Sequence, residues 1–475
     1  MNATHLHMPL PDWRALRQHC RRSFAANDAP ETGLLAVLGL SNGEPRRFLI
    51  AKIFWPEDGD LKVAENQAVV FDAAYLRRAH LYMREHGLAG LAVFHTHPHA
   101  DRTVDFSRYD DQQEPLLVRN LQEIHPATRV VSVVVGKAST RGRWWDQGSD
   151  LPAPMGNLVA IGDLLEFHSL AGDTPPPPPS AAGAFDRGVA VTGTGALARL
   201  RAMRVAVVGA SGTGSLTCEL LARAGCRAIT VVDDDVVKTE NLNRILHASA
   251  TDAEQARPKV DVVKVAIESI GLGCQVTALR ANIIDDTVLP VLRDVDIVFG
   301  CVDKALPRLV LSRFSAQYLL PYIDVGAEIG ADAGGIVSID SRVNLVSPGR
   351  PCLMCTGLVT PRRLQHETQS TGERSRVVSQ GYSQDLVLEQ PAVMDLNMRA
   401  ASMGVLVLRH LLQPFLLPPL PVTIAESLVT YTTRPIAVAR EASSGCRVCV
   451  GNVHAGWGDC GPAIGMKAMA LASIA

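Results

Sequence analysis

The first third of the chain alternates short apolar runs with one long amphipathic stretch. Residues 33–40 and 47–55 are apolar runs of strand length, joined by the polar turn SNGEPR. Residues 71–87 place apolar side chains at helical spacing and end on a glycine, which predicts a helix. Residues 88–98 and 129–136 are further strand-like runs, the first with histidines at its end. This order predicts a mixed α/β unit.

The larger second part of the chain has a different rhythm, in which apolar runs alternate with helical stretches. The strand-like runs lie within residues 204–215, 228–235, 295–303 and 320–327. Strands that alternate with helices predict a doubly wound parallel sheet. Ligands of such sheets bind at the carboxyl ends of the strands, where this sequence places a glycine-rich loop and several acids.

A proline-rich stretch divides these two parts. Residues 174–182 (TPPPPPSAA) contain five consecutive prolines, which can join neither a helix nor a central strand and predict a stiff spacer. At 475 residues the chain is long enough for two or three domains. We therefore expect a first domain over 1–170, a linker over 171–184, a second domain over 185–450 and a tail over 451–475.

The composition is that of a globular protein, with 47% hydrophobic and 20% charged residues. The net charge of -2, from 46 basic and 48 acidic residues, favours neither nucleic acid nor an anionic membrane as a partner. The N-terminus lacks the uninterrupted apolar core of a signal peptide, and no stretch approaches the roughly 20 apolar residues of a membrane span. We expect a cytoplasmic protein.

Two histidines end a predicted strand of the first domain. His95 and His97 are two positions apart, so their side chains point the same way, and Asp110 can return to them from the start of a helix. Two imidazoles and one carboxylate leave a fourth position for water on a tetrahedral zinc ion, which is the catalytic arrangement. Glu31, before the first strand-like run, is our candidate for the general base.

This part of the sequence resembles the JAMM (JAB/MPN) metalloproteases, whose motif is an upstream glutamate followed by HxHP and SxxD. The family cleaves isopeptide or C-terminal peptide bonds of ubiquitin-like proteins. The resemblance implies that His95, His97 and Asp110 bind a catalytic zinc ion and that Glu31 is the general base. It also implies that Ser107 stabilises the tetrahedral intermediate. The loop between the two parts of the motif is about two residues longer than is usual in the family.

A glycine-rich loop opens the second domain. Gly209, Gly212 and Gly214 follow a strand and precede a helix, as a backbone cradle for phosphate requires. Ser211 replaces the second glycine of the GxGxxG pattern. The loop alone is equally compatible with a dinucleotide-dependent dehydrogenase.

The polar residues that follow this loop favour a different chemistry. Asp233 ends the next strand and can accept hydrogen bonds from a ribose. Asn241, Arg244, Lys259 and Asp303 follow in order. Phosphate chemistry needs cations to neutralise the developing charge and a carboxylate to hold magnesium.

Residues 185–450 resemble the ThiF/MoeB-type adenylyltransferases, whose Rossmann-like fold is shared with the ubiquitin-activating enzymes. The resemblance implies that Asp233 holds the ribose of ATP and Asp303 holds magnesium, with Asp235 as a second nearby acid. It implies that Arg187, in the lead-in sequence FDRG, reaches an active site, in one version that of the partner in a homodimer. The residues implied to face the phosphates are Asn241, Arg244 and Lys259.

Four of the ten cysteines form two CxxC pairs, Cys352/Cys355 and Cys446/Cys449. Two such pairs predict a closed tetrahedral zinc site with a structural role. The adenylyltransferase family carries the same two pairs. Zinc would tie the C-terminal segment to the domain across about 90 residues.

Relatives that form a thioester carry a cysteine after the first pair, but residues 356–397 of this chain contain none. Either the enzyme stops at the adenylate and passes it to an acceptor, or a hydroxyl such as Ser379 or Ser383 takes the acyl group. Cys301 lies in a strand and is better explained as a core thiol. The segment 360–384 is polar enough to form a loop.

These features predict a bifunctional enzyme of a ubiquitin-like pathway, for which a bacterial modification system is our preferred setting. One domain would trim or deconjugate the carrier protein with zinc, and the other would adenylate its C-terminal carboxylate with ATP and magnesium. The expected partners are a carrier protein that ends in glycine, a second copy of the chain and a conjugating enzyme. Two alternatives stay open: sulfur-carrier activation for thiocarboxylate formation in cofactor or thionucleoside synthesis, and a carrier-binding module without turnover.

Overall fold

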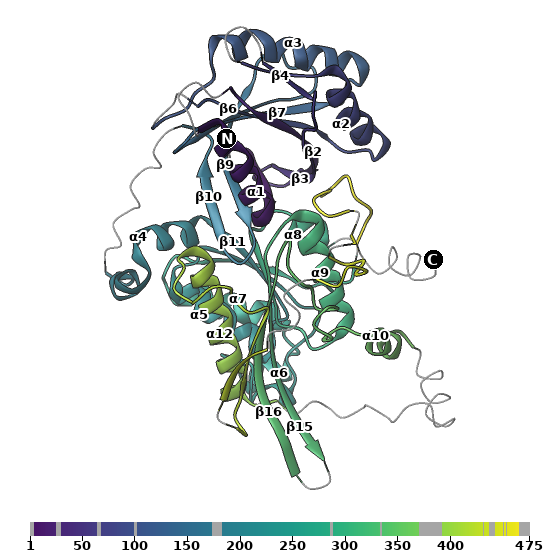
Figure 1. Ribbon diagram of the computed structural model, residues 1–475. Helices are drawn as coiled ribbons and strands as arrows, with labels where there is room; N and C mark the ends of the chain where they lie inside the picture. Colours follow the sequence, from purple (N-terminus) through teal and green to yellow (C-terminus); the bar gives the residue numbers. More distant parts are fainter. Residues whose placement is uncertain are drawn as a thin grey trace. The chain divides into compact units, whose positions relative to one another are not determined.

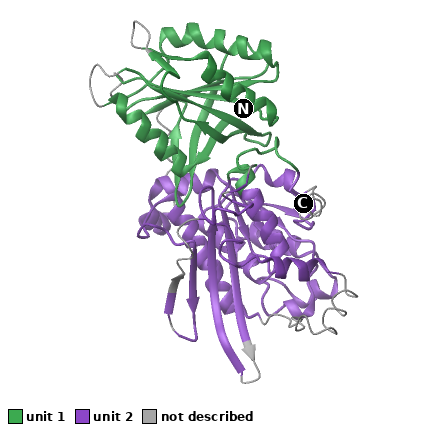
Figure 2. Ribbon diagram, turned by 45° about the vertical axis from the view of Figure 1, so that its right-hand side comes forward, with its two compact units in different colours: residues 1–177, 316–319, 453–462 green, residues 178–315, 320–452, 463–475 purple. Residues whose placement is uncertain are grey.

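The computed structural model divides the chain into two compact units, which Figure 2 shows in different colours. Unit 1 comprises residues 1–177, 316–319 and 453–462, and unit 2 comprises the remainder. The linker at 174–182, Ser379 and Ser383 lie outside the described residues. The structure describes residues 4–24, 30–63, 68–98, 102–172, 183–285, 288–332, 335–369, 392–430, 432–436, 442–449, 451–452 and 454–464.

Unit 1 is built on an eight-stranded mixed sheet in the order β1-β3-β2-β6-β7-β8-β9-β10, in which β1 also pairs with β9. The strands predicted around residues 33–40, 47–55, 88–98 and 129–136 are confirmed as β2, β3, β6 and β7. The bounds are β1 (Thr4–Pro9), β2 (Gly33–Ser41), β3 (Arg47–Phe54), β6 (Gly90–Thr96), β7 (Arg129–Val135), β8 (Thr140–Trp145), β9 (Ala153–Ile161) and β10 (Leu165–Ser169). A separate two-stranded sheet pairs β4 (Leu61–Val63) with β5 (Val69–Phe71).

Helices cover both faces of this sheet. The predicted helix is α2 (Ala73–Glu85), which packs with α3 (Arg108–Ile124) on one face (Figure 1). Helix α1 (Leu10–Cys20), followed by the 3₁₀ turn η1 (Arg21–Phe24), packs on the other face. A hydrophobic core lies on each face of the sheet, and alternate residues of β2 point into one or the other. The whole strand is therefore apolar, as its sequence indicates.

Unit 2 contains a second eight-stranded sheet in the order β13-β12-β11-β14-β15-β16-β17-β18. The strands from β13 to β15 are parallel, which confirms the predicted doubly wound sheet, whereas β16 to β18 are antiparallel and were not predicted. The bounds are β11 (Arg204–Val208), β12 (Ala228–Val232), β13 (Gln275–Leu279), β14 (Ile297–Gly300), β15 (Tyr322–Asp332), β16 (Gly335–Val346), β17 (Thr423–Ser427) and β18 (Thr432–Ile436).

The long helices of unit 2 are α4, α5, α7, α9 and α12. The bounds are α4 (Asp186–Ala202), α5 (Gly212–Ala224), η2 (Thr239–Asn241), α6 (Ala250–Glu254), α7 (Lys259–Ser269), α8 (Leu289–Leu292), α9 (Ala305–Tyr318), α10 (Pro361–Thr368) and α12 (Met394–Leu412). None of the helices in the described part of the chain combines the length and the apolar character that a membrane crossing requires.

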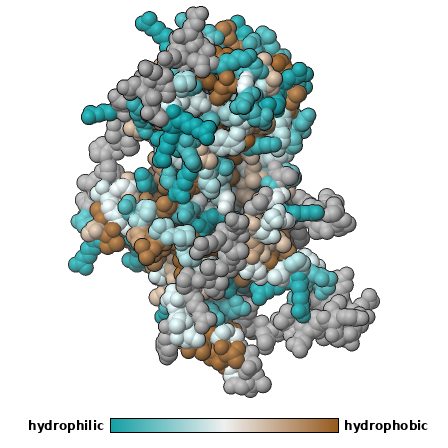
Figure 3. Space-filling view, viewed as in Figure 1, coloured by the Kyte–Doolittle hydropathy of each residue, from teal (hydrophilic) through white to brown (hydrophobic). Residues whose placement is uncertain are grey.

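The hairpin of β15 and β16 extends beyond the rest of the sheet (Figure 1). Figure 3 shows apolar atoms gathered near its end, where Ile336 and Val337 are exposed. Side chains of this kind on a two-stranded extension have few neighbours to cover them.

The segment 454–462 belongs to unit 1 although it comes after the cysteine pairs of unit 2. Leu40 of β2 donates its N–H to the carbonyl of Trp457, and the N–H of Asp459 returns to the carbonyl of Leu40 at 2.7 Å. The indole of Trp457 is buried in the core between β2, β6 and α2. The close approach needs glycine: a Cβ at Gly39 would lie 2.1 Å from the carbonyl oxygen of Gly456.

Candidate functional sites

The end of β6 and the start of α3 bring three metal-binding side chains together. His95 Nε2 lies 3.1 Å from Asp110 Oδ1, and His97 Nε2 lies 3.2 Å from Asp110 Oδ2. One potential ligand atom from each of the three residues lies within 4.8 Å of the other two. Two positions apart on an extended backbone, the imidazoles converge on the same carboxylate, and the cluster has the spacing of a metal centre.

Ser107 positions the carboxylate of this cluster. It is the N-cap of α3, and its hydroxyl donates to Asp110 Oδ2 at 2.8 Å while it accepts the N–H of Asp110 at 3.2 Å. The carboxylate in turn accepts the N–H of Ser107 at 2.6 Å, which completes a capping box. The SxxD part of the motif is therefore the device that fixes Asp110 on the first turn of the helix.

Glu31 reaches the cluster from the segment before β2. Its Oε1 lies 3.8 Å from His97 Nε2, and its Oε2 accepts the N–H of Val69 at 3.3 Å. Burial raises the pKa of Glu31, and the charges of His97 and His95 oppose that rise. An acid 64 residues away from the first histidine in sequence is thus a direct neighbour of the cluster.

The cluster favours an ionised carboxylate next to the imidazoles. Burial alone would raise the pKa of Asp110, but the adjacent imidazoles and the Ser107 N–H hold it well below the ordinary value. Burial opposes a charge on His97, but Asp110 and Glu31 together raise its pKa.

The donor set fits zinc. Two imidazole nitrogens and one carboxylate oxygen are ligands typical of catalytic zinc, and Nε2 of His95 is buried at 3.1 Å from the Asp110 carboxylate. The neutral form of such an imidazole would offer its Nε2 lone pair to a cation at the centre of the group.

A second layer of polar residues behind Asp110 was missed at the level of sequence. Arg143 of β8 donates Nε to Glu114 Oε2 and Nη1 to Asp111 Oδ1, each at 2.7 Å. Its guanidinium lies 3.8 Å from the ring centre of Phe106, the residue before Ser107. The spacing of Asp110 and Glu114 on one helical face was the available signal, whereas Arg143 lies on a strand whose pairing the sequence does not reveal.

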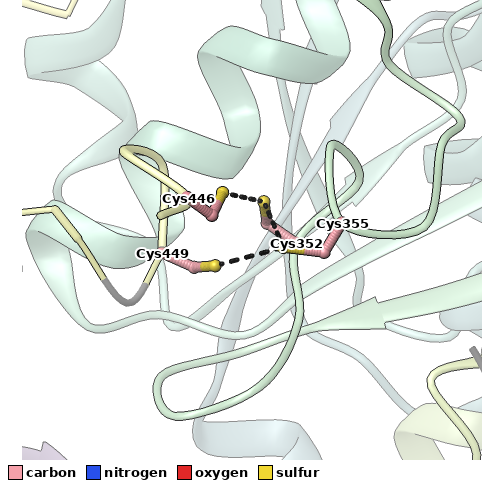
Figure 4. A group of neighbouring side chains, drawn as sticks. All are labelled: Cys352, Cys355, Cys446 and Cys449. Atoms are coloured by element: carbon pink, nitrogen blue, oxygen red, sulfur yellow. Dashed lines mark hydrogen bonds between the residues drawn. The ribbon is translucent and has the colours of Figure 1, made fainter. Parts of the chain in front are cut away.

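The four cysteines of the two CxxC pairs form a compact group in unit 2 (Figure 4). Their sulfur atoms are 3.6 Å apart between Cys352 and Cys446, 3.5 Å between Cys355 and Cys449, and 3.9 Å within the first pair. Ligands about 2.3 Å from a tetrahedral zinc ion are about 3.8 Å from one another. These distances exceed a disulfide bond of about 2.05 Å and fit a four-sulfur zinc site.

The glycine-rich loop joins β11 to α5 and leaves no space for a side chain at its glycine positions. Gly209 has φ +96°, and a Cβ there would lie 2.4 Å from the carbonyl oxygen of Cys301. A Cβ at Gly214 would lie 1.7 Å from the carbonyl oxygen of Gly209. The loop lies between the ends of β12 and β14, where the strand order reverses and doubly wound sheets bind ligands.

Asp233 fastens this loop to the end of β12. Its Oδ2 accepts the N–H of Ala210 at 2.7 Å, and its Oδ1 accepts the N–H of Asp235 at 2.9 Å. Burial raises its pKa, and the charge of Lys259 opposes the rise. Lys259 is buried and pairs with Asp235 at 2.8 Å, so the structure brings three of the predicted site residues together.

The other predicted residues of the second site lie after β12, after β14 and at the start of α4. Asn241 is buried in η2, and its Oδ1 accepts the N–H of Lys238. Arg244 follows η2, and its Cβ lies 3.6 Å from the position of a Cβ on Gly212. Asp303 is exposed just after β14, and Arg187 is exposed on the first turn of α4. The roles given to these residues stay predictions.

Two further features concern the segment that contains Asp303. Arg308, which was not singled out from the sequence, donates to the carbonyl of Asp303 at 2.9 Å and to the buried carboxylate of Asp324 at 3.0 Å. Cys301 is buried, and burial raises the pKa of its thiol to about 12. A thiol of this kind is inert at neutral pH, so Cys301 is a core residue as expected.

The strand order, with the glycine loop at the reversal point and acids around it, defines unit 2 as a domain of the doubly wound α/β class. The family model described as "ThiF family" matches residues 185–472, more than half of the chain. The chain belongs to the ThiF family.

Curated relatives support the same assignment. The sulfur carrier protein ThiS adenylyltransferase of Bacillus subtilis is 26% identical over 33% of this chain and 44% of its own length. The SAMP-activating enzyme E1 of Haloferax volcanii is 28% identical over 33% of this chain and 54% of its own length. The tRNA threonylcarbamoyladenosine dehydratase of Bacillus subtilis is 40% identical over 22% of this chain and 40% of its own length. The matches thus span about half of each relative.

A solved structure of Escherichia coli MccB also matches. It covers 57% of this chain and 75% of its own, at 17% identity and a TM-score of 0.46.

Proposed function

We propose that unit 2 uses ATP to adenylate the C-terminal carboxylate of a ubiquitin-like or sulfur-carrier protein. The observation that carries this proposal is the meeting of the glycine loop, Asp233, Asp235 and Lys259 at the reversal point of a ThiF-family sheet. Relatives named for adenylation of a sulfur carrier and for activation of SAMP support the choice of substrate class.

In the proposed reaction, a carboxylate oxygen of the carrier bonds to the α-phosphorus of ATP, the bond to the bridging oxygen breaks, and pyrophosphate leaves. Magnesium, when bound, would neutralise charge on the phosphates. Asp303 would hold it from the segment that follows β14, where Arg308 donates to the carbonyl of Asp303. Asp233 would accept the ribose hydroxyls, and the site cations Arg244 and Lys259 would face the phosphates, together with Asn241.

The acyl-adenylate would pass directly to an acceptor, since residues 356–397 contain no cysteine. The other version, an oxyester on Ser379 or Ser383, concerns residues outside the described part of the chain. For both versions we also propose a homodimer, in which Arg187 reaches the active site of the partner.

Pyrophosphate exchange tests the adenylation step. The full chain, given a carrier protein that ends in glycine, should exchange labelled pyrophosphate into ATP, and Asp303→Asn should reduce the rate by about 100-fold or more because it removes a charged magnesium ligand. Bound ATP without exchange for any carrier would instead support the binding-module alternative. A sulfur donor that takes the adenylate to a thiocarboxylate would identify the sulfur-carrier version.

We propose further that unit 1 is a zinc hydrolase that trims or deconjugates the same carrier protein. The observation that supports it is the group of His95, His97 and Asp110 with Glu31 3.8 Å from His97. A zinc ion held there would lower the pKa of a coordinated water to about 7. Glu31 would accept the proton of the attacking water and return it to the leaving amine.

Cleavage of a carrier fusion by Glu31→Gln tests this second activity. The amide keeps the shape of the side chain but cannot accept the proton, so cleavage should fall by about 100-fold or more while the zinc content is unchanged. Equal cleavage by the wild type and by Glu31→Gln would show that Glu31 is not the general base. Loss of zinc in Glu31→Gln would show instead that Glu31 is a ligand.

A further inference from the structure

Helices α5 and α12 run parallel and side by side in unit 2 (Figure 1). At their C-terminal ends, Ala224 of α5 and Leu412 of α12 line the same pocket. At their N-terminal ends, Gly212 of α5 meets Asn397 of α12. Two parallel helices therefore present their N-terminal turns, with the positive ends of their dipoles, at one place.

Asn397 lies at this meeting point and is 6% exposed. Its carboxamide has no hydrogen-bond partner anywhere in the described part of the chain, although its backbone N–H bonds to the carbonyl of Val393. A Cβ built on Gly212 would lie 2.2 Å from Asn397 Nδ2, so the amide is directed at the first turn of α5. The amide atoms are not sealed from solvent, so the free donor and acceptor are open to a ligand that enters at this point.

The surroundings of this amide favour an anion. The first turn of α5 has backbone N–H groups without helical partners, and it follows the glycine loop. The Cβ of Arg244 lies 3.6 Å from the Cβ position on Gly212, so the base of a cationic side chain is close by, while its guanidinium donates to the carbonyl of Glu240 and to Asn243 Oδ1. The carboxylate of Asp233 accepts the N–H of Ala210 at the start of the loop.

We propose that Asn397 is a nucleotide-binding residue, whose Nδ2 donates a hydrogen bond to a phosphate oxygen of ATP. The inference rests on the nucleotide site proposed for unit 2 and adds a second helix to it. The proposal also explains why position 212 is a glycine, because a side chain there would push the Asn397 amide out of the phosphate site. A residue far from the glycine loop in sequence thereby joins the loop in phosphate recognition.

Titration of the full chain with Mg-ATP and with adenosine tests this assignment. Asn397→Ala should weaken Mg-ATP binding by about tenfold, and the isosteric Asn397→Asp, which sets a carboxylate against the phosphates, by more. Both variants should bind adenosine like the wild type, because adenosine has no phosphate. A packing defect would instead weaken both ligands together.

Met398→Asp is the matched control. Met398 is the next residue of the same helix and is 46% exposed. An aspartate at this position adds the same charge as Asn397→Asp without altering the proposed contact with phosphate. This variant should bind Mg-ATP within about twofold of the wild type, because an exposed charge is screened. Equal losses in Asn397→Asp and Met398→Asp would overturn the proposed contact.

The remaining outcomes separate this inference from the proposed function. A wild-type chain that does not bind Mg-ATP would remove the nucleotide site itself. A wild-type chain that binds Mg-ATP, with Asn397→Ala and Asn397→Asp binding equally well, would overturn the inference alone. Loss of affinity for the carrier protein with unchanged affinity for Mg-ATP would also overturn it, because the amide would then recognise the carrier's carboxylate.

Discussion

His95 and His97 owe their common direction to the extended backbone at the end of β6, and Asp110 meets them because Ser107 caps α3. All three could be predicted as a group from spacing and from the SxxD pattern, since each depends on local geometry. Glu31 could only be chosen by motif, because its position depends on the pairing of β2 with β6. Arg143 and Glu114 depend on the packing of α3 against β8, which no local pattern encodes.

Arg143→Lys tests the layer of polar residues behind the group proposed to bind zinc. Lysine keeps the charge but loses the two-pronged contact with Glu114 and Asp111 and the stacking on Phe106. Zinc affinity of unit 1 should fall about tenfold, the low end of the range for residues that support metal ligands.

Arg14→Lys is the control for this comparison, since Arg14 forms an exposed pair with Glu166 at 3.4 Å. An exposed pair contributes little, so competition with a zinc chelator should give the wild-type affinity. Equal affinities for the two variants would assign Arg143 a role in fold stability only.

At the scale of elements, the parallel strands of unit 2 could be predicted because each is a short apolar run followed by a helix. The antiparallel strands β16 to β18 could not. Part of β16 is exposed, and Ile336 and Val337 interrupt any alternation of apolar and polar positions. The partners of these strands are set by a long hairpin and by the return of the chain after α12.

Gly214→Ala tests how tightly the loop between β11 and α5 is built. A methyl group 1.7 Å from the carbonyl oxygen of Gly209 forces the loop open, so Mg-ATP binding should be lost and the Tm should fall by several degrees. Gly195→Ala, in α4, meets no atom within 4 Å and should leave binding unchanged and the Tm equal or slightly higher. A tolerant Gly214→Ala would show that the loop has room that the structure does not give it.

At the scale of the whole molecule, the two groups of residues that could hold a metal ion belong to different units and offer different ligands. The full chain should therefore contain about two zinc ions. His97→Ala should remove the one in unit 1 and Cys446→Ser the one in unit 2, and elemental analysis of both variants and of the double variant measures this. Only Cys446→Ser should lower the thermal stability of unit 2, because a closed four-sulfur site contributes to folding. Loss of both ions in either single variant would contradict independent sites.

Trp457→Ala tests the contribution of the returning segment to unit 1. The substitution empties a buried site between β2 and α2, and truncation of a core tryptophan costs about 3–5 kcal/mol. Hydrogen exchange should accelerate in β2 and α2 but not in β11 or α5. Uniform exchange across both units, or no change, would show that the segment does not support unit 1.

The return of residues 454–462 to β2 has a consequence for how the protein is made. Trp457 emerges from the ribosome about 280 residues after the first stretch of unit 1 ends, at residue 177. At roughly 5–20 residues per second, that delay is on the order of tens of seconds. During it the N-terminal unit lacks one wall of its core, so unit 1 cannot complete its folding until the ThiF-family unit behind it has been synthesised.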